Sequence, residues 1–226
     1  MNYNLKVILF TRKELNSLQE IKFIKKNIKD LKIVYDDEID KKIKLPKHKY
    51  DYIISYRSKK ILKSNFLKKA RIAAINFHPG PPEFRGLGCA NYAIYKRSNY
   101  YGFTLHIMDH KIDHGRILFC KKFKINYKIS LNILLNQTYK IMGSFFVKFI
   151  NDIKSNKFEK LYLNNKKTYK WSNKIYKKKD LEKLYKINLP INKEKIERIL
   201  KSTIYKNYKP YIQIRNLKYY LDYEKI

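Results

Sequence analysis

Short apolar runs alternate with segments of helical periodicity over most of the chain, and this alternation constrains its fold more than any other feature. Leu5–Thr11, apolar except for Lys6, predicts a buried strand, and Glu14–Ile28 carries apolar residues at helical spacing. Further strands are predicted over Leu31–Tyr35, Tyr52–Tyr56, Ile72–His78 and Gly102–Met108, further helices over Ser58–Lys69, Asn91–Tyr95 and Ser130–Ser155, and a loop over Asp36–Lys49. Because strands that alternate with helices are typical of parallel sheets, we expect an α/β fold with a doubly wound, mostly parallel sheet.

The last sixty residues have a different pattern. A polar, weakly patterned stretch precedes them, and they are predicted to form short helices over Lys179–Tyr185 and Lys193–Lys201 and a hairpin over Tyr211–Leu221 that turns at Arg215-Asn216. We therefore expect a main domain of residues 1–165 and a small helix-plus-hairpin extension of residues 166–226.

The net charge of +33 restricts the choice of partners less than it first suggests. Only eight of the 52 basic residues are arginine, the side chain whose planar fork best contacts phosphates and bases. The lysines are spread along the whole chain, as AT-rich codon usage would produce. We favour that explanation over nucleic-acid binding, although the charge would help to attract an anionic substrate, and the sequence leaves open whether it has a function.

Cysteine usage and the N-terminus suggest a cytoplasmic protein. Cys89 and Cys120 are too few for a disulfide framework, and we expect two reduced thiols, with a bridge between them left open. The apolar run Val7–Phe10 is too short for a signal peptide, and no uncharged apolar stretch reaches the ~18 residues of a membrane span. No membrane contact is expected.

Residues with special backbone or acid–base properties gather in one segment. Five of the six glycines, four of the five histidines and three of the six prolines lie between residues 76 and 115. Glycine permits backbone shapes that other residues avoid, and histidine is the usual acid–base group near neutral pH. We interpret residues 76–115 as the functional segment.

A candidate catalytic trio lies within this segment. Asn76 and His78 are two residues apart at the end of a predicted strand, so their side chains share one face. An amide and an imidazole there can bind an oxyanion and transfer a proton. Asp113 follows the next predicted strand, and a carboxylate beside an imidazole orients it and favours its protonated form. Such a trio suits acyl transfer to an amine.

Three motifs in this region strongly resemble the 10-formyltetrahydrofolate-dependent formyltransferase family: Asn-x-His-Pro in Asn76–Gly86, Gly-x-Thr-x-His in Gly102–His106, and Asp-x-Gly from Asp113, seven residues after His106. The match is specific over about residues 50–120 and weaker to about 165. The resemblance implies a Rossmann-like formyltransferase fold, with Asn76, His78 and Asp113 as catalytic residues, 10-formyltetrahydrofolate as co-substrate and no metal.

The same resemblance implies further site residues. It assigns folate contacts to Lys59, Lys60, Leu62, Asp109, His110, Lys111 and Ile112, and substrate contacts to Arg85 and His106. Arg85 could equally serve only to shape its loop. The spacing of four between His106, His110 and His114 could place zinc ligands on a helix, but the first of them is in a predicted strand, which makes a metal site the weaker interpretation.

Two departures from the family pattern guide the choice of substrate. The residues after the first strand lack the glycine-rich phosphate loop of glycinamide ribonucleotide formyltransferase, and the tail is too short for the barrel of methionyl-tRNA formyltransferase. The tail resembles that of the nucleotide-sugar N-formyltransferases, which are commonly dimers. A nucleotide-linked amino sugar is therefore the leading substrate prediction. A tRNA formyltransferase without the barrel and a non-catalytic, basic RNA-binding module on a decayed formyltransferase fold are the alternatives.

Overall fold

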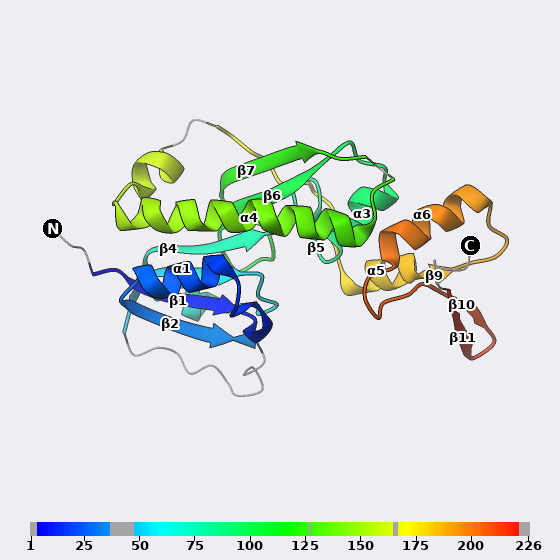
Figure 1. Cartoon of the computed structure of the whole chain (residues 1–226), viewed down its shortest axis with the longest axis horizontal. Helices are drawn as coiled ribbons and strands as arrows, with labels where there is room; N and C mark the ends of the chain where they lie inside the picture. Colours follow the sequence, from blue (N-terminus) through cyan, green and yellow to red (C-terminus); the bar gives the residue numbers. More distant parts are fainter. Residues whose placement is uncertain (1–3, 37–47, 127, 165–166, 222–226) are drawn as a thin grey trace. The chain divides into compact units, whose positions relative to one another are not determined.

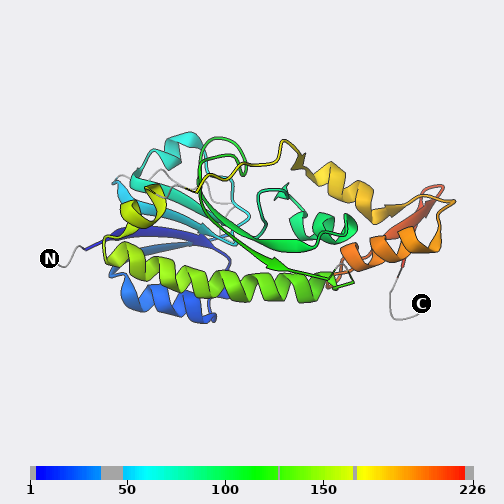
Figure 2. The same ribbon diagram turned by 90° about the horizontal axis from the view of Figure 1, so that it is seen from above.

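The computed structural model describes residues 4–36, 48–126, 128–164 and 167–221 (Figures 1 and 2). The chain divides into two compact units. The first contains Met1–Pro79, Phe103–Cys120 and Lys140–Lys170, and the second contains Gly80–Gly102, Lys121–Tyr139 and Trp171–Ile226. The boundary expected at residue 165 came from the sequence pattern and stays a prediction. Among the described residues, none of the helices combines the length and apolar character needed to cross a membrane.

A six-stranded sheet in the order β2-β1-β3-β4-β6-β7 organises the fold. Its strands are β1 Lys6–Thr11, β2 Asp30–Tyr35, β3 Tyr50–Tyr56, β4 Ala70–His78, β6 Tyr100–Ile107 and β7 Ile117–Lys124. The pairs β1–β2, β1–β3 and β3–β4 are parallel, whereas β4 and β6 are antiparallel. The mostly parallel sheet is therefore confirmed, and β7 is an edge strand that the sequence did not predict.

Helices of the first unit cover both faces of its strands. Figure 2 shows α1 (Gln19–Asn27) and part of α4 (Leu131–Lys154) along one face and α2 (Ser64–Leu67) on the other. On the α4 side, the ring centroids of Phe77 and Phe146 are 5.1 Å apart, and on the α2 side those of Phe10 and Phe66 are 5.3 Å apart. This aromatic packing on both faces confirms the doubly wound architecture.

Two predicted helices are shorter than expected. The helix predicted over Ser58–Lys69 forms only at Ser64–Leu67, because Asp36 accepts hydrogen bonds from the Ser58 hydroxyl and the Lys59 backbone, both at 2.5 Å, and thereby holds that end as a loop. The helix predicted from Glu14 instead begins at Gln19, after a 3-10 turn at Lys13–Leu15. Most of the predicted loop Asp36–Lys49 lies outside the described residues.

The second unit contains most of the predicted C-terminal elements. Its elements are α3 Cys89–Tyr95, α5 Lys178–Tyr185, α6 Lys193–Thr203, the pair of β5 Arg85–Gly86 with β8 Ile175–Tyr176, and a sheet of β9 Lys186–Ile187, β10 Tyr211–Ile214 and β11 Leu217–Tyr220. The hairpin β10–β11 turns at Arg215-Asn216, as predicted. The core is formed by buried residues of α3, such as Ala93 and Ile94, with Leu134 and Leu184 packed around them.

Candidate active site

Two neighbouring strands place three polar side chains of the first unit together. Asn76 in β4 lies directly opposite His106 in β6, and directly opposite residues of antiparallel strands project to the same face. Phe77, between Asn76 and His78, packs on Tyr56 and on α4. Strand alternation therefore directs Asn76 and His78 to the opposite face, as the sequence predicted.

Asp113 reaches the same cluster from the turn that follows β6. Its Oδ2 lies 3.3 Å from Nδ1 of His78, and its Oδ1 lies 3.5 Å from both Nε2 of His106 and Nδ2 of Asn76. The two imidazoles and the carboxylate are buried, with exposed fractions of 4%, 2% and 8% for His78, His106 and Asp113. Burial strengthens each of these charge interactions, because little water competes for the polar atoms.

The hydrogen bonds of His106 define its tautomer. Its Nδ1 lies 2.8 Å from the carbonyl oxygen of Ile107, which can only accept, so Nδ1 carries a proton. Its Nε2 lies 3.1 Å from Nδ2 of Asn76, which can only donate, so Nε2 accepts. In this arrangement His106 orients the Asn76 amide.

Two hydrogen bonds to Asp109 stabilise the turn that carries Asp113. Asp109 accepts hydrogen bonds from the Lys111 backbone at 2.9 Å and from His114 at 2.6 Å. Partial burial raises the pKa of Asp109, but the hydrogen bonds from His114 and Lys111 outweigh it and hold the pKa below its usual value. Asp113 itself has a φ of 43°, a left-handed conformation that aspartate tolerates better than most residues.

Gly115 closes this turn against β6. A Cβ atom at Gly115 would lie 2.0 Å from the carbonyl oxygen of Ile107, the same oxygen that accepts from His106. No side chain fits into that space, so the position requires glycine. The glycine thereby fixes the distance between the Asp113 turn and β6.

The residues predicted to contact folate fall into two groups. Leu62 is 8% exposed and packs in a core cluster with Ile8, Phe10 and Phe66. Lys59 and Lys60 donate backbone hydrogen bonds that shape the loop after β3, and their side-chain roles stay predictions. The second group, Asp109–Ile112, forms the turn before Asp113, in which Ile112 is 49% exposed.

Arg85 belongs to the second unit, where it is 6% exposed. Its Nη1 donates to the carbonyl oxygen of Ser172 at 3.1 Å, and its guanidinium lies 5.7 Å from the ring centroid of Trp171. These contacts hold residues 171–172 against the loop before α3. They match the loop-shaping alternative, and the substrate role of Arg85 stays a prediction.

The described residues contain no group of three or more His, Cys, Asp or Glu side chains that could hold a metal ion. His106, His110 and His114 do not share a helix: His106 lies in β6, and His114 pairs with Asp109 in the following turn. Cys89 is a buried thiol and Cys120 is a half-buried one.

Two features of the site were not predicted. One is the contact between the Ile107 carbonyl and Nδ1 of His106. Every residue has a backbone carbonyl, so the sequence cannot indicate which one makes this contact. The other is Asp36, which accepts hydrogen bonds from the Ser58 hydroxyl and the Lys59 backbone N–H. Its position directly after the second strand was the one available signal, because carboxyl ends of parallel strands meet at one edge.

Comparison with known proteins identifies related sequences. The family model described as formyl transferase matches residues 8–150. The chain is 37% identical over 108 residues to the bifunctional polymyxin resistance protein ArnA of Wigglesworthia glossinidia brevipalpis, a match over 47% of this chain and 15% of ArnA. It is 32% identical over 76 residues to the GDP-perosamine N-formyltransferase of Brucella melitensis, over 33% and 29% of the two chains. A third relative, the methionyl-tRNA formyltransferase of Clostridium tetani, is 28% identical over 67% of this chain and 47% of its own. The chain thus spans less than half the length of each of these curated relatives.

Solved structures share the fold over nearly the whole chain. A 4-N formyltransferase from Francisella tularensis superposes with a TM-score of 0.75 at 22% identity, covering 96% of this chain and 97% of its own. The N-formyltransferase from Helicobacter canadensis, solved with folinic acid and dTDP-3-aminofucose, gives a TM-score of 0.70 at 19% identity, covering 95% and 86%. These likenesses confirm the predicted fold, and the family match extends over more than half of the sequence. The chain therefore belongs to the formyl transferase family.

Proposed function

We propose that this protein transfers a formyl group from 10-formyltetrahydrofolate to a primary amine, and that the amine belongs to a nucleotide-linked amino sugar. The observation that carries the proposal is the cluster of Asn76 with the buried side chains of His78, His106 and Asp113, in which one carboxylate contacts two imidazoles and an amide. An amide donor beside a carboxylate-supported imidazole is suited to binding an oxyanion and moving a proton.

Each residue has a definite task in this proposal. One amide hydrogen of Asn76 is engaged by His106 at 3.1 Å, whereas its contact with Asp113 is long, at 3.5 Å, and can be exchanged for the formyl oxygen. His78, protonated and held at Nδ1 by Asp113, adds a second hydrogen-bond donor to that oxygen, and this donor is positively charged. As the acceptor amine bonds to the formyl carbon, the bond to the folate nitrogen breaks, and the proton lost by the amine passes to that nitrogen.

The substrate class rests on the related proteins. One curated relative is a GDP-perosamine N-formyltransferase, and the Helicobacter canadensis structure contains folinic acid and dTDP-3-aminofucose. We extend these substrates to this chain. In the same proposal, Lys59, Lys60, Leu62 and Asp109–Ile112 hold the folate, Arg85 contacts the substrate, and residues 166–226 supply substrate or dimer contacts. A cytoplasmic location and a homodimer stay predictions.

The test is a turnover assay with matched variants. The protein is mixed with 10-formyltetrahydrofolate and dTDP-, UDP- or GDP-linked amino sugars, and the release of tetrahydrofolate is followed. We expect turnover with one sugar, reduced about 100-fold or more in His78→Ala and Asp113→Asn. His48→Ala, which alters an exposed histidine, should keep the full rate. Folate binding without turnover on any sugar would reject the substrate class, and an undiminished rate in Asp113→Asn would reject the site.

A second candidate is methionyl-tRNA formylation, favoured by the match to the Clostridium tetani enzyme over 67% of this chain. Charged initiator tRNA in the same assay distinguishes the two substrates. RNA affinity that falls steeply with salt, without any turnover, would instead support the non-catalytic RNA-binding alternative.

A further inference from the structure

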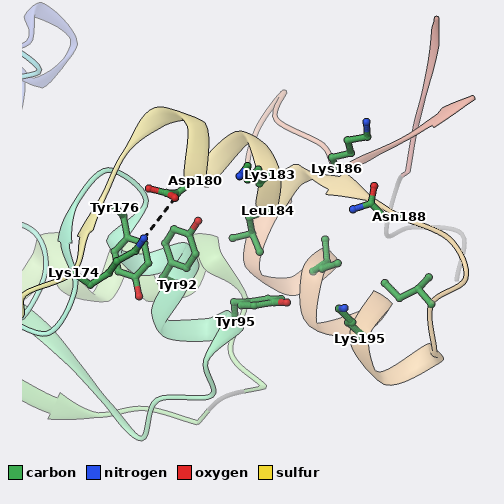
Figure 3. Close-up of a pocket in the computed structure, with 12 residues that line it drawn as sticks. Tyr92, Tyr95, Lys174, Tyr176, Asp180, Lys183, Leu184, Lys186, Asn188 and Lys195 are labelled. Carbon is green, nitrogen blue, oxygen red and sulfur yellow. Dashed lines mark ion pairs between the residues drawn. The ribbon is translucent and has the colours of Figure 1, made fainter. Parts of the chain in front are cut away.

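The second unit contains a pocket of about 350 Å³ whose lining includes none of the four residues of the candidate catalytic cluster. It lies among α3, β8, α5, α6 and the segment that follows α5, and Figure 3 shows the side chains of these elements around it. Its size is within the range typical of small-molecule sites, about 300–1,000 Å³. Every lining residue belongs to the second unit, so the pocket is complete within that unit.

Aromatic rings form one wall of the pocket. Tyr92 and Tyr176 stack with their ring centroids 3.8 Å apart and their planes 16° apart, and both are buried. Tyr95 extends this wall from the end of α3 and remains partly exposed. Leu184 and Ile199, both buried, add aliphatic side chains to the pocket lining. The wall therefore offers a flat apolar surface to a planar ring.

Burial keeps the phenol of Tyr92 neutral. It is the main cause that raises the pKa of Tyr92 to about 12, and the nearby Asp180 carboxylate acts in the same direction. At neutral pH the Tyr92 phenol thus adds no negative charge that would offset the basic residues around it.

The pocket is lined by four lysines and one acid. Lys174 pairs with Asp180 at 3.6 Å, marked by the dashed line in Figure 3, and Lys186 donates to Gln213 at 3.0 Å. Lys183 and Lys195 form no ion pair within the described part of the chain, and both are exposed. Two ammonium groups are therefore available to an anion at the pocket.

A further cation lies behind the aromatic wall. The guanidinium of Arg198 lies 4.9 Å from the ring centroid of Tyr95. Its Nε is buried and has no hydrogen-bond partner among the described residues. The guanidinium adds positive potential beside the ring that is partly exposed to the pocket.

We propose that this pocket binds a small aromatic phosphate, of the class of a nucleoside diphosphate, with its base against Tyr95 and its phosphates at Lys183 and Lys195. The combination of a flat aromatic wall with unpaired ammonium groups matches a planar base joined to a polyanion, because stacking and charge act on different parts of the same ligand. None of the residues in the candidate catalytic cluster lines the pocket, so nucleotide binding there can be tested apart from formyl transfer.

The test measures binding of dTDP, UDP, GDP and ADP to the full chain by calorimetry, with inorganic pyrophosphate as the probe for charge alone. We expect saturable binding of at least one nucleotide, weakened about tenfold or more in Lys183→Glu/Lys195→Glu and in Tyr95→Leu. The matched control, Lys124→Glu/Lys128→Glu, makes the same charge change at exposed lysines of the same unit outside the pocket. It should keep the affinity within about twofold. Thermal melts confirm that each variant is folded.

Several results would overturn the proposal. Absence of nucleotide binding in the unaltered protein would show that the pocket is not a nucleotide site. Equal weakening by the two double charge reversals would show that the nucleotides bind through general surface charge. Pyrophosphate binding as tight as that of the nucleotides would remove the role of Tyr95. If a single-stranded RNA oligonucleotide binds and none of the nucleotides does, the ligand of the pocket is a nucleic acid and not a small nucleotide. Because the readout is binding, a failure of formyl transfer leaves the test intact.

Discussion

At the scale of single residues, the site depends on Asp113 more than on any other side chain. This carboxylate contacts His78, His106 and Asn76, and it does so from a residue in the left-handed backbone region. Such a conformation persists only when the surrounding structure fixes it. The fixing contacts are those of Asp109 and Gly115 on either side of Asp113, so neither of these residues needs to contact a substrate to affect the reaction.

A first prediction concerns Gly115→Ala. The new methyl group would lie 2.0 Å from the Ile107 carbonyl oxygen, so the turn must move and carry Asp113 with it. We expect the formyl-transfer rate to fall about 100-fold, since misplacement by about 1 Å has that effect. Stability should fall by ~1–3 kcal/mol. Gly143→Ala is the control, because its methyl group meets only the flexible end of Glu20, at 2.9 Å. Equal rates in the two variants would contradict the positioning role.

A second prediction concerns the protonation of His106. The Ile107 carbonyl accepts from Nδ1 and the Asn76 amide donates to Nε2, so the neutral imidazole should carry its proton on Nδ1. Nitrogen-15 NMR at neutral pH should detect this single tautomer for a signal that disappears in His106→Gln. A signal with protons on both nitrogens would mean that His106 forms an ion pair with Asp113, and that the Asn76 amide is turned the other way.

At the scale of elements, buried cross-links between helices hold the second unit together. Asn91 of α3 donates to the Ser202 carbonyl of α6 at 2.7 Å, and both groups are buried. Neighbouring Tyr185 of α5 also hydrogen-bonds Asn91, while burial raises the pKa of Tyr185 to about 12. One amide thus contacts three helices, and its removal leaves polar atoms buried without a partner.

The third prediction is that Asn91→Ala lowers the free energy of unfolding by ~1–3 kcal/mol, the usual cost of an unsatisfied buried group. Asn136→Ala is matched in chemistry and lies on α4, where the exposed Asn136 side chain donates a 3.4 Å hydrogen bond to Asn132, its one side-chain hydrogen bond among the described residues. We expect it to change stability by ~0.5 kcal/mol or less. Urea unfolding of both variants makes the comparison, and similar losses in the two would show that the cross-link is not important.

The elements also show what the sequence could and could not predict. Mostly apolar runs without strict alternation identified β1, β3 and β4, because strands buried on both faces need no alternation. β7 was missed, since it is an edge strand whose second half carries exposed lysines. Only the part Ser64–Leu67 of the helix predicted over Ser58–Lys69 forms, because a distant residue, Asp36, holds its first part as a loop. Long-range hydrogen bonds of this kind leave no local pattern.

The candidate site was predictable to a similar degree. The spacing of two between Asn76 and His78 predicted their common face, and the observed packing of Phe77 agrees. The place of Asp113 beside His78 followed from a motif and was expected only in outline. The network through His106 depends on strand register and on a backbone carbonyl, and neither can be derived from residue types alone.

At the scale of the whole molecule, the composition separates into a charged exterior and a phenolic interior. The chain has 52 basic residues and 21 tyrosines, and many of the tyrosines take core positions that other proteins fill with leucine or phenylalanine. Burial raises the pKa of Tyr52 and Tyr162 in the first unit and of Tyr92 and Tyr101 in the second. These buried phenols therefore keep their protons to higher pH in the folded chain than in the unfolded chain.

This titration leads to the last prediction, which concerns stability at alkaline pH. Above pH 10 the unfolded chain loses phenolic protons that the folded chain retains, so the folded state binds more protons and the free energy of unfolding falls as pH rises. For Tyr92 the contribution is intact below pH 10 and is lost as pH rises through its folded pKa of about 12. Each such phenol adds a slope of at most about 1.4 kcal/mol per pH unit. Urea unfolding between pH 8 and 11.5 should therefore give a shallower slope for Tyr92→Phe, whereas Tyr219→Phe, at a position 51% exposed, should match the unaltered protein. Equal slopes for all three would mean that the ring of Tyr92 is reached by water in the folded state.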